Sequence, residues 1–570
     1  MKKELLSFIS ENNLSPFAKE KTTIRRKDES IFKTKEAKQV FSRVIEKISS
    51  GFCFKETDNL WNRFPFTQSA EEIKERQEYF KSLKQAENSI LKQLTVPKTT
   101  WKPKYSIIVA TSDEKSFSEL QKLNCPVQFI ISEQDIQGLQ NEDIIQAVDC
   151  DDFSYLLEQL PQSVFLDSVD DAYLERYLEQ LSGWRANFEL LKNCENEEIS
   201  KLVSELLPLL ELINNKEKEK LRRENIEIML EKINSEIAQE ISKLNISGSV
   251  LMSMLSKNKM PIEIENIINR AIKSSNLQEN IFTSSIPVLI DEKELEKIIK
   301  EQAANENTSV AEKIKKQSEK LRKIPELLRK LENLLILFDF ESGISKYLGG
   351  NYPEISSELV IEQAKNLFLE QAQEISFNLS EQNKCSILTG ANSGGKTTLL
   401  EHILQLMTLF QLGLPVSGKI KMPVFSDIYY FAKTKGSSSK GAFETLLSQM
   451  NQINPGNKTL ILADEIESVT EPGVAGRIIT ATCEYFISKD CFLVIATHLG
   501  QEIQKNMPPS SRMDGIEAKG LDEYFELIVD HNPVLGKLAS STPELIVEKL
   551  SSLEKTEYFQ FLNLRIKNKS

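Results

Sequence analysis

One eight-residue segment constrains the fold of this chain more than any other feature. Residues 385–389 read as a buried strand, residues 390–397 match G-x-x-x-x-G-K-[ST], and residues 398–404 read as a helix. In that context the pattern forms a phosphate-binding loop, in which glycines let backbone N–H groups wrap the phosphates at a helix N-terminus. We expect Lys396 to reach the β- and γ-phosphates of ATP and Thr397 to ligate Mg²⁺. The predicted nucleotide-binding residues are Gly390, Ala391, Asn392, Ser393, Gly394, Gly395, Lys396, Thr397 and Thr398.

Two adjacent carboxylates end a second apolar strand. Residues 459–463 form the strand, and Asp464 and Glu465 follow it directly. We expect Asp464 to hold Mg²⁺ through a water, and Glu465 to polarise the water that attacks ATP. An adjacent Asp-Glu pair is typical of ATPases that hydrolyse ATP between two nucleotide-binding subunits. The sequence therefore predicts a Mg²⁺-dependent ATPase with Glu465 as a catalytic residue.

A third apolar strand ends in a histidine. Residues 491–497 form the strand and His498 follows it, in a chain with only three histidines. An ABC-class ATPase carries its γ-phosphate-sensing histidine at this place, so His498 is predicted to be catalytic. His402 and His531 have no comparable context and are interpreted as structural.

A Ser/Gly-rich loop at residues 436–444 precedes a helix and lies shortly before Asp464. ABC-class enzymes present their signature loop there, offering a hydroxyl and a helix N-terminus to the γ-phosphate bound by the opposite subunit. Ser439 and Gly441 are the expected signature-loop residues, and Ser439 is the candidate for the hydroxyl.

The length of 570 residues requires several domains, because a single hydrophobic core stops growing near roughly 250–300 residues. We expect a helical N-terminal region at 1–100, a small α/β connector-like domain at 101–165, a helical core and lever with clamp-like arms at 166–345, and an α/β ABC-class ATPase domain at 346–570. The connector is predicted from strands at 105–110, 127–131 and 143–148, which carry no phosphate-binding glycine loop.

The arms are predicted from apolar residues at helical spacing. They cover about 202–241 and 292–335, on either side of a more irregular middle at about 245–290, and suggest an antiparallel lever that leaves and returns. The net charge of −13 argues against nucleic-acid binding when taken alone, yet the second arm is locally basic. The residues expected to contact DNA are Lys315, Lys316, Lys320 and Lys323.

Composition also bears on the compartment. The seven cysteines form no Cys-x-x-Cys and read as reduced thiols, without a disulfide frame or zinc site. No run of about 18 apolar residues predicts a membrane span, and the N-terminus leads into no apolar signal core. We therefore expect a cytoplasmic protein with no membrane partner.

The C-terminal part of the chain resembles the MutS family of DNA-binding ATPases over about residues 346–550. Three motifs carry the resemblance: residues 389–398, residues 462–465 and residues 496–498. The likeness is closest to the short archaeal MutS-like (second-type MutS) branch, on the strings at 466–473, 514–522 and 541–546. The Smr nuclease that ends bacterial second-type MutS proteins is not expected here, because too few residues follow the last predicted helix.

Two departures from the family pattern bear on function. The signature loop of the family usually reads Ser-x-Phe, whereas Gly441 stands two residues before Phe443 here. The mismatch-reading Phe-x-Glu of MutS has no counterpart in a recognisable domain, although the triplet occurs by chance at residues 54–56 and 117–119.

The resemblance implies a homodimeric, Mg²⁺-dependent ATPase that binds duplex or branched DNA with little sequence preference, as an ATP-gated clamp in DNA repair or recombination control. An ATPase clamp on ribosomes is one alternative, and true mismatch recognition is another, disfavoured because no intercalating reader is visible. A structural chromosome clamp is disfavoured because its ATPase would be split between the two ends of the chain, whereas every motif here lies within residues 390–498.

Overall fold

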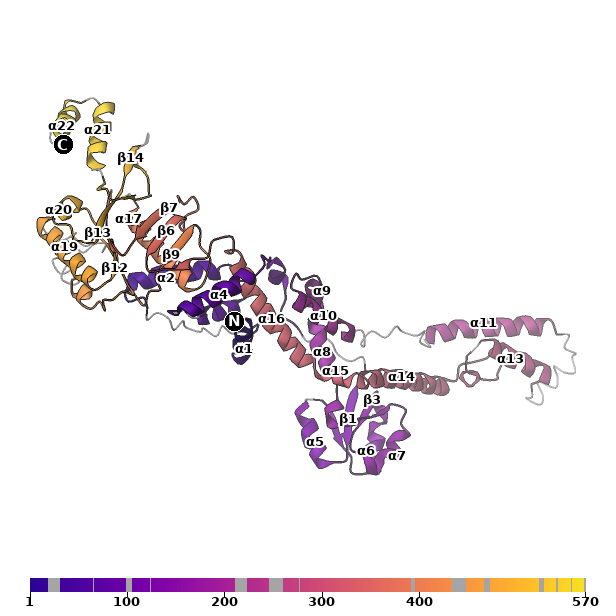
Figure 1. The fold of residues 1–570 in the computed structure, drawn as a ribbon. Helices are drawn as coiled ribbons and strands as arrows, with labels where there is room; N and C mark the ends of the chain where they lie inside the picture. Colours follow the sequence, from indigo (N-terminus) through magenta and orange to yellow (C-terminus); the bar gives the residue numbers. More distant parts are fainter. Residues whose placement is uncertain are drawn as a thin grey trace. The chain divides into compact units, whose positions relative to one another are not determined.

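Figure 1 shows the fold in a computed structural model, in which two compact units form. The larger unit contains Met1–Leu94 and Leu331–Ser570, and the smaller unit contains Thr95–Lys330. The structure describes residues 1–18, 31–64, 66–98, 105–123, 125–210, 223–244, 260–275, 277–390, 395–432, 447–465, 472–521, 527–539, 542–554 and 556–567.

A six-stranded sheet forms the centre of the larger unit, in the order β10-β11-β12-β8-β13-β16. The first five strands are parallel, and β16 pairs antiparallel with β13 at one edge. The strands are β8 (Cys385–Gly390), β10 (Asp427–Phe431), β11 (Thr459–Asp464), β12 (Phe492–Ala496), β13 (Ser511–Ile516) and β16 (Val534–Leu535).

Helices cover both faces of this sheet, which explains why its strands are apolar without alternation. On β11, Leu460 and Leu462 join the cluster that includes helix α17 (Lys396–Gln411). Ile461 and Ala463, on the opposite face, join the cluster that includes α19 (Pro472–Ser488) and α20 (Gly500–Gln504). The sheet is therefore the middle of three layers.

Smaller elements complete the larger unit. A mixed sheet has the order β5-β9-β6-β7, and β14 pairs antiparallel with β15. These elements are β5 (Glu354–Ile355), β6 (Leu359–Ala364), β7 (Ile375–Leu379), β9 (Lys419–Met422), β14 (Ala518–Leu521), β15 (Leu527–Val529), α21 (Thr542–Leu553) and α22 (Glu557–Lys567).

The N-terminal residues belong to this same unit and pack on its main sheet. Phe32 forms a parallel bridge with Ile428 of β10, and Thr34 Oγ1 donates a 2.8 Å hydrogen bond to the Tyr430 carbonyl oxygen. The N-terminal helices are α1 (Lys2–Glu11), α2 (Lys35–Ser49), α3 (Lys55–Arg63) and α4 (Ala70–Ser82). The sequence placed residues 1–100 in a region of their own, whereas the contacts place residues 1–94 with the nucleotide-motif sheet.

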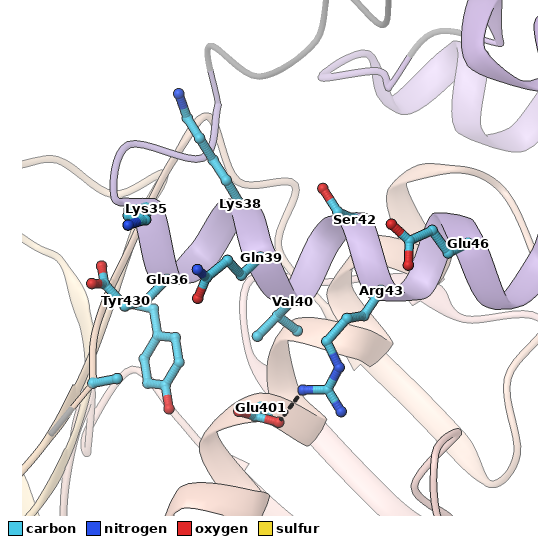
Figure 2. A pocket seen from close by; sticks show the side chains of 11 residues that line it. Lys35, Glu36, Lys38, Gln39, Val40, Ser42, Arg43, Glu46, Glu401 and Tyr430 are labelled. Carbon is cyan, nitrogen blue, oxygen red and sulfur yellow. Dashed lines mark hydrogen bonds and ion pairs between the residues drawn. The ribbon is translucent and has the colours of Figure 1, made fainter. Parts of the chain in front are cut away.

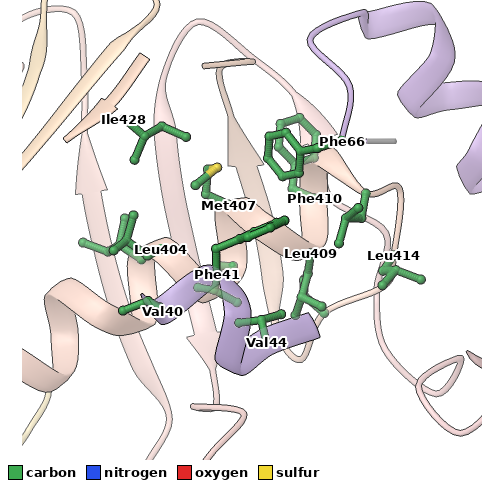
Figure 3. Packing of buried hydrophobic residues seen from close by; sticks show 14 of the residues in the cluster. Val40, Phe41, Val44, Phe66, Leu404, Met407, Leu409, Phe410, Leu414 and Ile428 are labelled. Carbon is green, nitrogen blue, oxygen red and sulfur yellow. The ribbon is translucent and has the colours of Figure 1, made fainter. Parts of the chain in front are cut away.

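Helix α2 lies against α17, the helix that follows the phosphate-loop motif. Figure 3 shows the side chains that meet there, among them Val40, Phe41, Val44, Leu404, Met407 and Leu409. At the rim of this contact, Arg43 Nη1 lies 3.1 Å from Glu401 Oε2 (Figure 2). The amphipathic pattern of α2 therefore covers the nucleotide-motif helix.

The smaller unit contains a four-stranded parallel sheet in the order β2-β1-β3-β4. The three expected connector strands are confirmed as β1 (Ile107–Thr111), β2 (Val127–Phe129) and β3 (Ile144–Ala147), and β4 (Ser163–Phe165) adds a fourth. Its short helices are α5 (Glu114–Leu120), α6 (Glu133–Gly138) and α7 (Ser154–Glu158).

The remaining helices of the smaller unit are α8 (Glu175–Gly183), α9 (Arg185–Leu191), α10 (Glu197–Leu210), α11 (Arg223–Ser242), α13 (Ile262–Ser274), α14 (Glu292–Lys315) and α15 (Ser318–Arg322). The expected irregular middle contains α13, and one cluster joins Ile233 of α11, Ile268 of α13 and Leu295 of α14. The first arm therefore packs on α13 rather than along the whole second arm. Helix α16 (Ile324–Ser345) crosses the division between the units.

Short 3-10 turns link these elements at Ser89–Gln93, Gln121–Leu123, Leu139–Asn141, Asp151–Phe153, Val169–Asp171 and Glu279–Ile281. Among the residues that the structure describes, no helix is both long enough and apolar enough to span a bilayer.

Candidate nucleotide site

The phosphate-loop motif joins β8 to α17 through two glycines with left-handed backbone. Gly390 has φ +138° and Gly395 has φ +91°, values that L side chains rarely adopt. A Cβ at Gly390 would stand 2.5 Å from the Ile516 carbonyl oxygen, and one at Gly395 would stand 2.8 Å from His531 Nδ1. Both glycines are therefore required by conformation and by close approach. Ala391, Asn392, Ser393 and Gly394 lie outside the described residues.

Lys396 is buried where the loop enters α17. Lys396 is 2% exposed, and its Nζ donates a 2.7 Å hydrogen bond to the Gly390 carbonyl oxygen. The same Nζ lies 3.3 Å from His498 Nε2. The ammonium is thus held between the first glycine of the loop and the histidine that follows β12.

Thr397 and Asp464 meet although they come from different elements. Thr397 Oγ1 donates a 2.5 Å hydrogen bond to Asp464 Oδ2, and Asp464 is 3% exposed. Asp464 pairs in register with Ala496, which pairs with Leu388, so three neighbouring strands end together here. A hydroxyl and a carboxylate are the hard oxygen donors that suit Mg²⁺, so these two residues fit that ion.

Glu465 and His498 form a second pair at the same sheet edge. Glu465 Oε1 lies 2.7 Å from His498 Nε2, and their side chains are 10% and 37% exposed, respectively. Glu465 has φ +47° and its N–H donates a 2.9 Å hydrogen bond to the Ala496 carbonyl oxygen. The turn after β11 therefore points this carboxylate toward the end of β12.

A buried aspartate supports the phosphate-loop strand from the neighbouring strand β13. Asp514 is 0% exposed, and its Oδ2 accepts a 2.6 Å hydrogen bond from Ser386 Oγ of β8. Its Oδ1 accepts a 2.8 Å hydrogen bond from Arg512 Nε and a 2.9 Å bond from the Gly536 N–H. Asp514 therefore ties β8, β13 and the β16 turn together.

We expect Asp514→Asn to lower the free energy of unfolding by about 3 kcal/mol, because breaking a buried ion pair leaves its partner uncompensated. Asp490→Asn is the matched control, since Asp490 pairs with Lys384 at the surface with a side chain 57% exposed. Thermal and urea unfolding would measure both variants. Equal midpoints for the two variants would contradict the supporting role of Asp514.

Comparison with known proteins identifies the family. No family model matches the chain. The protein named DNA-binding protein MutS2 from Pyrococcus furiosus is 31% identical over 565 residues, which cover 93% of this chain and 98% of that protein. The chain belongs to the MutS family. The predicted likeness to this family, and to its second-type MutS branch, is confirmed.

Shorter matches link this MutS-family chain to other members. Endonuclease MutS2 of Borreliella burgdorferi is 31% identical over 156 residues, which are 26% of this chain and 20% of that protein. The human MutS protein homolog 4 is 29% identical over 181 residues, which are 29% of this chain and 18% of that protein.

A pocket of about 100 Å³ borders the phosphate loop of this MutS-family chain. Gly395, Thr398 and His402 line it from the α17 side, and Leu369 and His531 line it from two loops. His402 and His531 were interpreted from sequence as structural, yet both line a pocket beside the predicted nucleotide-binding residues. No local pattern marks them, because their positions depend on how distant loops fold back to α17.

The four lysines predicted to contact DNA lie at the end of α14 and along the short helix α15 rather than along one continuous helix: Lys316 caps α14, Lys320 lies in α15 and Lys323 caps α15. Lys315 ends α14, and its Nζ lies 2.8 Å from Asp167 Oδ1 and 2.7 Å from the Phe165 carbonyl oxygen. Its charge is therefore already compensated within the unit. Lys316, Lys320 and Lys323 are exposed.

Ser439 and Gly441 lie outside the described residues, so their role stays a prediction. Of the predicted site residues in the larger unit, the structure brings together Gly390, Gly395, Lys396, Thr397, Asp464, Glu465 and His498.

Proposed function

We propose that this MutS-family chain is an ATP-hydrolysing, Mg²⁺-dependent, DNA-binding protein whose ATPase lies at the C-terminus and which acts as an ATP-gated homodimeric clamp. The observation that carries the proposal is the meeting of Lys396, Thr397–Asp464 and Glu465–His498 at the carboxyl ends of three adjacent parallel strands. Ligands of open α/β sheets bind outside those ends.

Each residue then has a separate task. Thr397 and Asp464 would hold Mg²⁺, which would neutralise part of the negative charge of the phosphates. Lys396 would bind the same phosphates as an ammonium. Glu465 would orient the attacking water and take its proton while the water oxygen bonds to the γ-phosphorus.

The bond that breaks joins the γ-phosphorus to the oxygen it shares with the β-phosphate, which leaves ADP and inorganic phosphate. His498, held by Glu465 and next to Lys396, would contact the γ-phosphate and report its presence. Lys396 and His498 are held in place by the fold before the reaction begins. Groups that are preorganised in this way stabilise the charge that develops in the transition state.

Dimerisation follows from the kind of site proposed. ATPases with an adjacent Asp-Glu pair complete each site with the signature loop of a second subunit, here Ser439 and Gly441 of the partner copy. ATP would then gate the closing of two copies around DNA.

DNA is proposed as the partner because the Pyrococcus relative bears the name DNA-binding protein MutS2. Binding would depend on phosphate contacts from exposed lysines such as Lys316, Lys320 and Lys323, and would show little sequence preference. Roles in DNA repair or recombination control are proposed because membership of the MutS family implies them. No observation on the described residues favours the ribosome-clamp or mismatch-reading alternatives.

We expect reversal of Lys316, Lys320 and Lys323 to Glu to weaken DNA binding and to flatten its dependence on salt. Each lost phosphate contact should reduce the slope of log affinity against log salt by about 0.9. The matched control reverses Lys74, Lys84 and Lys92, three exposed lysines of the larger unit, and changes the net charge equally. Identical slopes for the two triple variants would remove these three lysines from the DNA surface.

The proposal as a whole is tested by the rate of ATP hydrolysis alone and with homoduplex, mismatched or four-way-junction DNA, or with ribosomes. Stimulation by every DNA at similar levels is expected. Stimulation only by mismatched DNA or only by ribosomes would support the corresponding alternative, and absence of ATP hydrolysis would overturn the enzymatic proposal.

A further inference from the structure

The negative charge of this chain is concentrated in one small domain. This acidic domain (residues 105–171) forms the four-stranded parallel sheet with its short helices, and it contains fourteen Asp and Glu but only two Lys. Its net charge of −12 nearly equals the −13 of the whole chain. A basic segment (residues 313–330) ends α14, forms α15 and begins α16, and it carries eight Lys and Arg against two Glu. The smaller unit therefore contains two parts of opposite charge.

The acidic domain packs directly on the helix that leads into the basic segment. Ala311 of α14 is 3% exposed and lies in one apolar cluster with Ile144 of β3 and Val164 of β4. Thr308 Oγ1, one turn earlier on α14, donates a 2.9 Å hydrogen bond to the Pro161 carbonyl oxygen. These contacts hold the carboxylates of the acidic domain beside the cations of the basic segment.

Two cations of the basic segment pair with the acidic domain, and the two pairs differ in burial. Asp171, which pairs with Arg322, has a side chain only 6% exposed, so this pair is built into the fold. Lys315 Nζ lies 2.8 Å from Asp167 Oδ1, and the Asp167 side chain is 81% exposed. Exposed ion pairs contribute little to stability, so a competing anion can take the place of Asp167 at little cost.

We propose that Asp167 masks Lys315 from DNA, so that the acidic domain restrains DNA binding on the basic segment. This inference rests on the proposed DNA-binding function. A phosphate reaches Lys315 only by displacing Asp167, and the cation that the freed carboxylate then attracts offsets the cation released from DNA. The other carboxylates of the domain repel phosphates within about one Debye length, about 8–10 Å. Phosphates are therefore directed to the exposed Lys316, Lys320 and Lys323.

Equilibrium binding of a random-sequence DNA duplex to the full-length protein, over a series of salt concentrations, tests the masking. Asp167→Asn keeps the size of the side chain and removes its charge. The variant should bind DNA about 3- to 5-fold more tightly than the wild type, with a slope of log affinity against log salt steeper by about 0.9, because Lys315 gains a phosphate contact.

Asp170→Asn is the matched control. It removes the same charge three residues away, from an exposed side chain that forms no ion pair among the described residues. It should change the affinity by less than about 2-fold and leave the salt slope unaltered, because no cation is released for a new phosphate contact.

A double-mutant cycle separates unmasking of Lys315 from a general change in the electrostatic field. Lys315→Gln alone should have little effect on DNA binding, whereas in the Asp167→Asn background it should abolish the gain in affinity and slope. If Asp167→Asn binds no more tightly than Asp170→Asn, or if its gain persists without Lys315, Asp167 does not mask Lys315, although DNA binding stands. If the wild-type protein binds no duplex, the proposed DNA-binding function fails, and the masking role fails with it.

Discussion

Glu465→Gln should lower kcat for ATP hydrolysis by about 100-fold or more and leave the affinity for ATP nearly unchanged. The glutamine keeps the size and the backbone setting of Glu465, whose N–H is fixed on the Ala496 carbonyl oxygen. It loses only the ability to take a proton from water. That interaction matters in the transition state more than in the ground state, so the loss falls on kcat.

Glu517→Gln is the matched control for this prediction. Glu517 follows β13 in the same sheet, and its carboxylate lies 2.5 Å from Lys537 Nζ rather than at His498. Its change should leave kcat near the wild-type value. Hydrolysis by Glu465→Gln at the wild-type rate would show that Glu465 does not act on the attacking water.

The same variant separates catalysis from assembly. Because unhydrolysed ATP would persist between two subunits, Glu465→Gln should accumulate as an ATP-bound dimer, seen by size-exclusion chromatography with Mg²⁺ and ATP. A slow variant that is no more dimeric than the wild type would contradict the composite site and leave the phosphate-loop assignment in place.

The residues that meet at this edge of the sheet could be predicted from sequence because each of them is encoded locally. The phosphate-loop motif, Asp464–Glu465 and His498 each follow an apolar strand, and parallel strands of one sheet end at the same edge. What the sequence lacked was the strand order, which places β12 between β8 and β11. That order explains why His498 contacts both Lys396 and Glu465.

Packing partners could not be predicted in the same way. The periodicity of Val40, Phe41 and Val44 indicates a helix with an apolar face, but not that α17 covers it. Likewise the basic run around residue 315 was visible, whereas the pairing of Lys315 with Asp167 joins residues 148 positions apart. A charge pattern gives no information about a partner that only the tertiary fold supplies.

Lys396→Met should weaken ATP binding by about 100-fold, since one or two charge-assisted hydrogen bonds to phosphate are each worth about 1.5–3 kcal/mol. The side chain is buried rather than solvent-facing, with Nζ on the Gly390 carbonyl oxygen and next to His498. Methionine fills most of the lysine volume, so the loop keeps its packing while the cation is lost.

Lys384→Met is the control for Lys396→Met, because Lys384 lies just before β8 at the opposite end of that strand and pairs with Asp490. Its change should leave the dissociation constant for ATP unaltered in an equilibrium binding measurement. The two variants should also unfold at similar temperatures, which separates lost phosphate contact from lost structure. If both variants bind ATP as the wild type does, the buried ammonium of Lys396 serves only to neutralise the Gly390 carbonyl, and the phosphates must be held by the backbone of the loop.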